Sequence, residues 1–247
     1  ATNQNGRYNN IDRGVVEITL PYPVIGRDVH GFLTNDMTLA LQDRVAPTDT
    51  TTTDLADVAD HVVFCVPYGS KSDDYSDWIG YARVPMDIDL PERFSYLNDR
   101  WCDTLPLAIH ELAHNLGFVH SGDPSGESYG DGSCLMGHSV EQRGGPEYCF
   151  NGNKNWLAGW FRDKSIDLSN TPSWVGRLYT NLDYTKTNVD YVLLKVQDMY
   201  IQYNVARDYN RGVQEYRDEV TIATGFDQEG LRWSYLRAGL SWGDSYV

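Results

Sequence analysis

Positive charge is scarce in this chain of 247 residues. Lysine and arginine together number 20, whereas aspartate and glutamate number 35, so the formal net charge is −15 with neutral histidines. A field of this sign repels nucleic-acid phosphates and anionic lipid headgroups. We therefore expect no nucleic-acid partner, and we expect a soluble protein that acts on basic or neutral partners.

Long apolar runs are also missing. The longest runs, such as Val62–Val66, have the length of a strand, whereas a membrane-spanning helix needs about 20 apolar residues. We therefore expect no membrane insertion. The first ten residues are polar, contain no hydrophobic stretch typical of a signal peptide, and begin with alanine. We interpret the chain as a mature or trimmed protein that has lost a targeting segment.

Cysteine is rare, with four residues in the chain. Cys65, Cys102, Cys134 and Cys149 contain no Cys-x-x-Cys pair, and an even number suits disulfide bonds in one of three connectivities. Four reduced and buried thiols are the alternative. Aromatic residues are abundant, with 17 tyrosines and 7 tryptophans, whereas methionine numbers only 4. Together these features favour a secreted, extracellular protein.

Hydrophobic patterning predicts a mixed first part of the chain. We expect strands over 14–20, 61–67 and 78–85, the last at a sheet edge, and helices over 36–43 and 104–117. The last of these has the clearest signal, because Pro106 stands near its start and Gly117 suits its end. Residues 121–155 are rich in Gly, Ser, Asp and Asn, which predicts irregular structure.

Short β-rich segments follow a polar stretch at residues 162–171. They are VGRLYT, VDYVLLKV, MYIQYNVA, EVTIAT and LRWSYLRAGL. Several short strands at this spacing predict a small antiparallel, sandwich-like module. We therefore predict an α+β fold with two domains, one over residues 1–165 and an all-β one over residues 166–247.

Three histidines stand at metal-binding spacing in the sequence HELAHNLGFVH, which begins at His110. On a helix His110 and His114 share one face, with about 5–6 Å between their Cβ atoms, so both imidazoles can reach one ion. Gly117 ends the helix and allows His120 to return to that ion. Three histidines leave a position for water, as in a catalytic zinc site, and Glu111 beside them can act as general base and acid. Three hydrogen-bonded or surface histidines are the alternative.

The segment resembles the long signature of the metzincin zinc peptidases, which a methionine turn follows. Residues 133–138, SCLMGH, resemble that turn. The resemblance implies that Met136 lies beneath the three imidazoles as a hydrophobic base without binding the metal, whereas an ordinary buried methionine is the alternative. It also implies that residues 1–165 form a metzincin-like catalytic domain with a mixed twisted sheet, an active-site helix and a Met-turn.

Within the metzincins the chain is most similar to the gametolysin (autolysin) family. The likeness lies in HELAHNLGFVHSG, YGDGSCLMG, CFNGNKNWLAGW and the β-rich C-terminal segments, and it extends from about Val62 onward. Some members of that family carry glutamine at the first ligand position, where this chain has His110. The first sixty residues resemble nothing that we can place.

The resemblance suggests two further candidates. The strand that contains Gly80, Tyr81 and Ala82 resembles the edge strand along which metzincins bind an extended substrate, although a plain sheet strand is the alternative. His138 stands two residues beyond Met136, where some metzincins carry a tyrosine that touches the metal or stabilises the tetrahedral intermediate. The imidazole could donate the same hydrogen bond or bind zinc, and a half-exposed loop histidine is the alternative.

Other polar residues carry weaker signals. His30 and His61 are expected to be structural. Asp73-Asp74 and residues 123–131 could hold Ca²⁺, but they lack EF-hand spacing, and solvated acidic loops are the alternative. Residues 126–130, GESYG, match the pattern of a hydrolase nucleophile turn without the required strand and helix, so we expect a plain loop.

We therefore predict a zinc-dependent metalloendopeptidase with one catalytic Zn²⁺, secreted and monomeric. Its expected substrates are proteins or peptides of the extracellular matrix or cell wall, cleaved by a zinc-activated water with Glu111 as general base and acid. One alternative is a matrix-binding or structural protein with a vestigial zinc site. Another is a zinc hydrolase that acts on a non-peptide amide.

Overall fold

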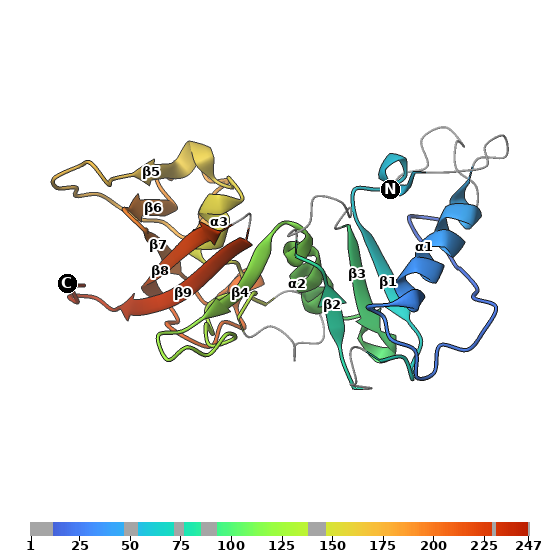
Figure 1. Cartoon of the computed structure of the whole chain (residues 1–247). Helices are drawn as coiled ribbons and strands as arrows, with labels where there is room; N and C mark the ends of the chain where they lie inside the picture. Colours follow the sequence, from blue (N-terminus) through green and yellow to red (C-terminus); the bar gives the residue numbers. More distant parts are fainter. Residues whose placement is uncertain are drawn as a thin grey trace. The chain divides into compact units, whose positions relative to one another are not determined.

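The computed structural model describes residues 12–46, 54–71, 77–84, 93–137, 147–228 and 231–246 (Figure 1). The chain divides into two compact units, one of residues 1–83 with 93–103 and one of residues 84–92 with 104–247. Within the described ranges there are two sheets, both with parallel and antiparallel pairs, and few helices. This arrangement confirms the predicted α+β class. None of the described helices has the length and apolar character needed to cross a membrane.

The first unit contains a three-stranded sheet and one long helix. Strand β3 (Phe94–Asn98) lies between β1 (Val62–Val66), to which it is parallel, and β2 (Gly80–Ala82), to which it is antiparallel. Helix α1 (Phe32–Val45) contributes apolar residues at every fourth position to the core of this unit: Leu33, Met37, Leu41 and Val45. Short 3₁₀ turns lie at Leu55–Asp57 and Asp99–Trp101.

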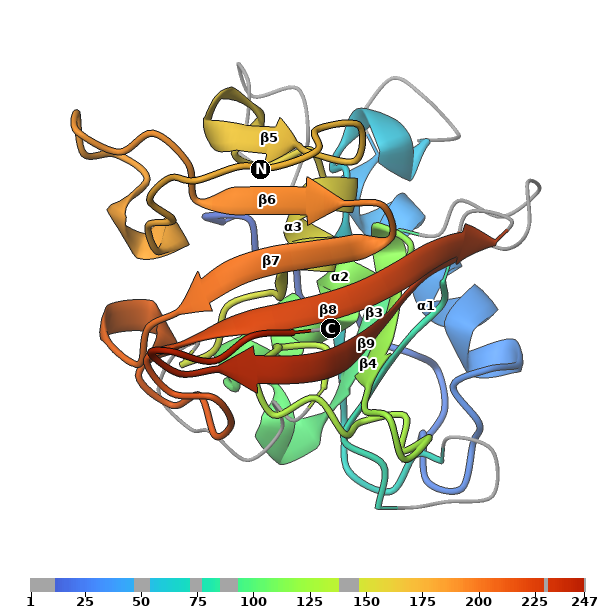
Figure 2. The same cartoon turned by 90° about the vertical axis from the view of Figure 1, so that its left-hand side faces the viewer.

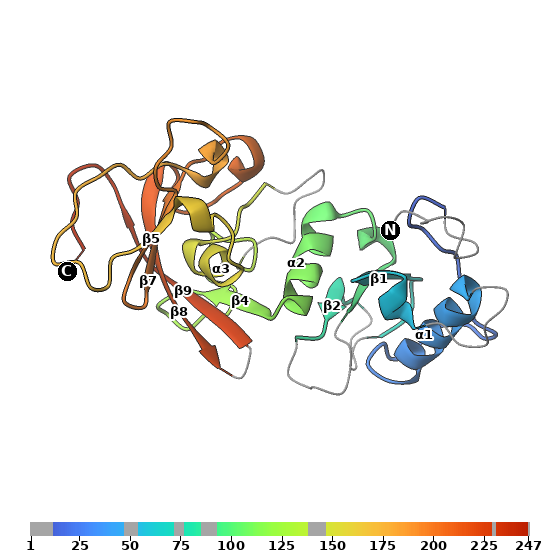
Figure 3. The ribbon, with the colours of Figure 1, turned by 90° about the horizontal axis from the view of Figure 1, so that it is seen from above.

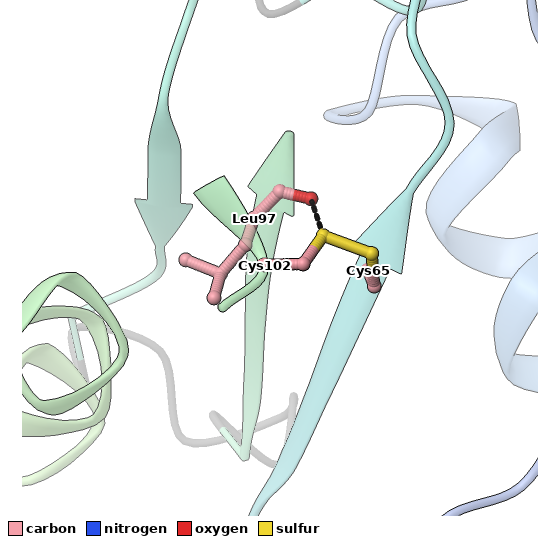
Figure 4. The surroundings of a disulfide bond; sticks show 3 residues. All are labelled: Cys65, Leu97 and Cys102. Carbon is pink, nitrogen blue, oxygen red and sulfur yellow. Dashed lines mark hydrogen bonds between the residues drawn. A yellow bond between two sulfur atoms is a disulfide. The ribbon is translucent and has the colours of Figure 1, made fainter. Parts of the chain in front are cut away.

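A disulfide bond joins Cys65 of β1 to Cys102, which lies just beyond β3, and Leu97 of β3 lies beside it (Figure 4). It closes a separation of 37 residues within the first unit. This bond confirms that the chain forms a disulfide. Cys134 and Cys149 are free thiols in this structure, so the expectation of a disulfide for every cysteine is not met.

The sequence predicted part of the first unit, with one wrong strand and one missed strand, β3. The helix expected over 36–43 is confirmed and is longer, the strand over 61–67 is confirmed as β1, and the strand over 78–85 shrinks to β2 at the sheet edge. The strand expected over 14–20 is wrong. Alternate residues of that segment do pack against the core, but among the described residues its backbone has no partner strand beyond the bridge between Asp12 and Val15.

The second unit is built on a six-stranded sheet, whose strands Figure 2 shows side by side. Their order is β4 (Phe118–Gly122), β9 (Leu231–Leu240), β8 (Glu219–Gln228), β7 (Met199–Asn204), β6 (Leu193–Val196) and β5 (Ser165–Asp167). Strands β6 to β9 form an antiparallel meander, and β4 and β5 add to its two sides in parallel. The unit also has 3₁₀ turns at Arg162–Lys164, Asn181–Asp183 and Asp208–Asn210.

Two helices complete this unit. Helix α2 (Leu105–Asn115) confirms the helix expected over 104–117, and it precedes β4 directly. Helix α3 (Gly152–Leu157) packs on the sheet (Figure 3), and its N-cap residue Asn151 accepts a hydrogen bond from the backbone N–H of Lys154. This short helix was not expected, since the sequence predicted irregular structure up to residue 155.

Four of the five β-rich C-terminal segments contain a strand, whereas VGRLYT contains only the isolated bridge between Leu178 and Tyr191. Strand β9 pairs with β4, so the last strand of the chain extends the same sheet as the strand that follows α2. The boundary expected between residues 165 and 166 lies inside the second unit. The division into two domains and the sandwich-like module remain predictions.

Candidate metal centre

Helix α2 and the turn after it bring three histidines together. His110 and His114 lie one helical turn apart, with 4.9 Å between their ring centroids. Gly117 then adopts a φ of +83°, which favours glycine, and its N–H donates to the carbonyl oxygen of His114. The chain turns there into β4, which places the ring of His120 4.8 Å from that of His114 and 5.6 Å from that of His110.

Two of the three imidazoles are oriented by hydrogen bonds as metal ligands require. Nδ1 of His110 donates to the carbonyl oxygen of Leu135 at 3.0 Å, and Nδ1 of His114 donates to that of Phe118 at 2.6 Å. Because a carbonyl oxygen can only accept, both rings carry their proton on Nδ1, and the Nε2 lone pair is left for an ion.

The ligand atoms of the three histidines all lie within 4.8 Å of one another. Nitrogens on a tetrahedral zinc lie about 3.3–3.4 Å apart, given Zn–N bonds of about 2.0–2.1 Å. The triad therefore needs to close by no more than about 1.5 Å to hold one such ion. The donor set, its orientation and its spacing fit a metal.

Burial keeps these imidazoles neutral. It lowers the pKa of His110 to about 4 and that of His120 to about 3, and it also lowers the pKa of His114, where the neighbouring imidazoles act in the same direction. A neutral imidazole is the form that binds metal ions, so proton competition at these sites is weak.

Glu111 is buried next to the triad. Burial raises the pKa of its carboxyl to about 8, and within the described part of the chain no residue donates a hydrogen bond to it. A carboxylate in such surroundings has basicity suited to taking up a proton near neutral pH.

Met136 lies in the apolar layer under this site. Its side chain is fully buried and packs with Ala113 of α2, Phe118 of β4 and Cys134. The turn is held close to α2 and β4, because the carbonyl oxygen of Leu135 accepts from His110 and that of Met136 accepts from the N–H of Ser121 at 2.9 Å. The role of Met136 as a base beneath the imidazoles remains a prediction.

A buried carboxylate anchors the loop that leads into the methionine turn. Asp131 accepts hydrogen bonds from the hydroxyl of Ser121 at 2.7 Å, from the side-chain amide of Asn151 at 2.9 Å, and from both the N–H and the hydroxyl of Ser133. The backbone of Gly137 lies so close to the backbone of Asp131 that a Cβ at position 137 would overlap the carbonyl oxygen of Asp131. Asp131 therefore ties β4, α3 and the turn together.

Tyr129 is a residue of this site that the sequence did not reveal. Its ring lies 3.9 Å from that of His120 and 6.4 Å from that of His110, centroid to centroid, and the side chain is 43% exposed. Burial of the hydroxyl and the charge of Glu111 raise the pKa of Tyr129 to about 12. No spacing rule predicts a tyrosine in a turn as a neighbour of these histidines, because only the path of the loop after β4 brings it there.

The other candidates lie elsewhere. Gly80, Tyr81 and Ala82 form the edge strand β2 of the first unit, where the ring of Tyr81 contacts those of Tyr96 and His30. That contact agrees with a structural role for His30, whereas His61 is exposed directly before β1. His138 lies outside the described residues. Residues 126–130 form a loop with a turn at residues 128–129, as expected.

Nothing in the described chain supports calcium. Asp123 accepts hydrogen bonds from Ser125 and from the backbone N–H of Glu127. The carboxylate of Asp131 accepts its hydrogen bonds from Ser121, Ser133 and Asn151. Asp73 and Asp74 lie outside the described residues. Among the residues that the structure describes, His110, His114 and His120 are the one group of three candidate metal ligands.

Comparison with known proteins places the chain in a family. The model of the gametolysin peptidase M11 family matches residues 47–224, which include all three histidines, Glu111, Tyr129 and Met136. No curated protein and no solved structure shows a significant match to the chain.

Proposed function

The chain belongs to the gametolysin peptidase M11 family and is a metallopeptidase, and we propose that zinc is its metal and that it cleaves within extracellular protein chains. His110, His114 and His120 would hold the ion through Nε2, and Glu111 would be the general base and acid. The observation that carries the proposal is the meeting of three neutral imidazoles, two of them oriented by hydrogen bonds, beside a buried carboxylate.

The side chains support a hydrolytic mechanism. When bound, zinc supplies Lewis acidity that acidifies water and polarises a carbonyl group. Glu111 takes the proton from the attacking water and later delivers it to the departing amine. The carbonyl oxygens of Leu135 and Phe118 hold the first two imidazoles in the required tautomer, and Met136 with its neighbours excludes water from the protein side.

The substrate and the location are also part of the proposal. The family name denotes a peptidase, which supports a protein or peptide substrate. The proposed source of that substrate is the extracellular matrix or cell wall, and the proposed binding mode is an added strand along Gly80, Tyr81 and Ala82. The disulfide between Cys65 and Cys102 supports secretion, because such bonds persist in oxidising surroundings. We further propose that the protein acts as a monomer.

The test compares three forms of the full chain on a casein-type substrate. The wild type should cleave, lose activity with a zinc chelator and recover it with added Zn²⁺. Glu111→Gln should lower kcat by about 10²–10⁴-fold while retaining its zinc, because it removes only proton transfer. Glu17→Gln, an exposed glutamate of the first unit, is the matched control and should behave as the wild type.

Two results would contradict the proposal. Cleavage that persists in Glu111→Gln would exclude this mechanism. A wild type that loads with zinc and cleaves no protein would instead support a structural or matrix-binding role with a vestigial metal site.

A further inference from the structure

We propose that Tyr129 is a further catalytic residue of this site, whose hydroxyl donates a hydrogen bond to the scissile carbonyl oxygen as that oxygen gains negative charge. The inference rests on the proposed peptidase function. It starts from the position of the Tyr129 ring against the rings of His120 and His110.

Tyr129 lies on the accessible side of the histidine triad. On the protein side, Ala113, Phe118, Cys134 and Met136 are all buried, so no substrate can approach there. Tyr129 is 43% exposed and contacts His120, the least buried of the three histidines. A peptide that reaches the triad from solvent must therefore pass beside its ring.

The loop that carries Tyr129 is built to hold it in place. At one end, Asp123 accepts hydrogen bonds from Ser125 and from the N–H of Glu127, and its own N–H donates to the carbonyl oxygen of Glu127. At the other end, the N–H of Gly130 donates to that same carbonyl oxygen. Buried Asp131 follows at once. A hydrogen-bond donor held in advance at the position of developing charge lowers the barrier more than a mobile one.

The proposed role requires no proton transfer by Tyr129. The oxygen of water bonds to the carbonyl carbon, the C–N bond breaks, and Glu111 carries the proton to the amine, while the phenol keeps its own proton throughout. A phenol has an ordinary pKa of about 10, so it is a donor at neutral pH. Glu111 and Tyr129 thus act on different atoms of the same peptide bond.

The matched substitution is Tyr129→Phe, which keeps the ring against His120 and removes only the hydroxyl. With the zinc-loaded full chain we expect kcat to fall about 100-fold with little change in KM, because one donor to a developing oxyanion is worth about this much. Zinc affinity and the melting temperature should match the wild type. Tyr129→Leu, which removes the ring as well, separates packing from hydrogen bonding.

A binding measurement gives a readout besides activity. In the non-cleaving Glu111→Gln background, adding Tyr129→Phe should leave the Kd of a substrate peptide unchanged. The Kd of a phosphinic peptide, whose tetrahedral anionic oxygens imitate the transition state, should rise by about the same factor as kcat falls, because catalysis depends on preferential binding of the transition state.

Each contrary result has a distinct meaning. If Tyr129→Phe cleaves as well as the wild type and only Tyr129→Leu loses activity, the ring merely packs on His120, and the inference is wrong. If Tyr129→Phe binds zinc more weakly, the hydroxyl is a metal ligand, which also overturns it. If the zinc-loaded wild type cleaves no peptide, the proposed function fails first and the role of Tyr129 fails with it.

Discussion

Replacing Asp131 by alanine should strongly destabilise the unit that carries the metal site. The carboxylate is fully buried and accepts four hydrogen bonds. Ser121 and Asn151 keep a second partner in Ser234, whereas the N–H and hydroxyl of Ser133 have no other hydrogen bond among the described residues. Each buried donor left without a partner costs about 1–3 kcal/mol, and the vacated volume adds to this, so we expect a loss of about 3–5 kcal/mol.

The assay is thermal unfolding of the full chain followed by circular dichroism. For a unit of this size 1 kcal/mol corresponds to about 2–4 °C, so the melting temperature should fall by about 10 °C. Asp131→Asn keeps one acceptor oxygen and should show a smaller fall. Asp123→Ala is the matched control, because its hydrogen bonds are exposed and water can replace them.

The same variant should also release its metal faster, since Asp131 supports the turn whose Leu135 carbonyl orients His110. The reasoning is refuted if Asp131→Ala melts within about 2 °C of the wild type, or if Asp123→Ala is the more damaging of the two.

Two further predictions concern the metal-free protein and the methionine turn. Burial lowers the pKa of His110 from an ordinary 6.5 to about 4 and that of His120 to about 3. Below pH 6.5 the unfolded chain therefore binds more protons than the folded chain, and the free energy of unfolding should fall as the pH drops from 6.5 towards 4. Glu111, with its pKa raised from 4.5 to about 8, acts oppositely and should lower stability as the pH rises from 6.5 to 8. Urea unfolding at stepped pH should thus give a maximum near 6.5 whose alkaline limb disappears in Glu111→Gln, and a flat profile would contradict this. Separately, Met136→Ala should cost about 2–5 kcal/mol and Met136→Leu less than about 1.5 kcal/mol in thermal unfolding, and equal losses would argue against a packed base.

The parts of the fold that the sequence predicted correctly depend on local signals. Helix α2 could be predicted because its signals are all local: the spacing of its apolar residues, the proline near its start and the glycine just after its end. The strand expected over residues 14–20 was wrong, because the alternation of apolar and polar residues shows only that one side of the segment is buried and not that its backbone pairs with another strand. Strand β3 was missed, although it is the central strand of its sheet. Strand pairing depends on a partner that lies elsewhere in the chain.

The candidate site divides in the same way. The grouping of His110, His114 and His120 with Glu111 follows from helical periodicity and one glycine turn, so eleven consecutive residues contain it. Tyr129 and the carbonyl oxygen of Leu135 come from a loop that returns to α2, and Asp131 reaches Ser121 and Asn151 across the unit. No periodic pattern in the sequence predicts any of these contacts.

By itself the sequence therefore determined the grouping of the three candidate metal ligands with Glu111 and the mixed fold class, because short-range helix geometry decides which of these side chains share a face. Only the tertiary structure decided which groups orient the imidazoles, which aromatic ring lies on their open side and which strand completes the sheet beside them. Those contacts form between segments that are distant along the chain, and their positions depend on the packing of the whole unit rather than on any local pattern.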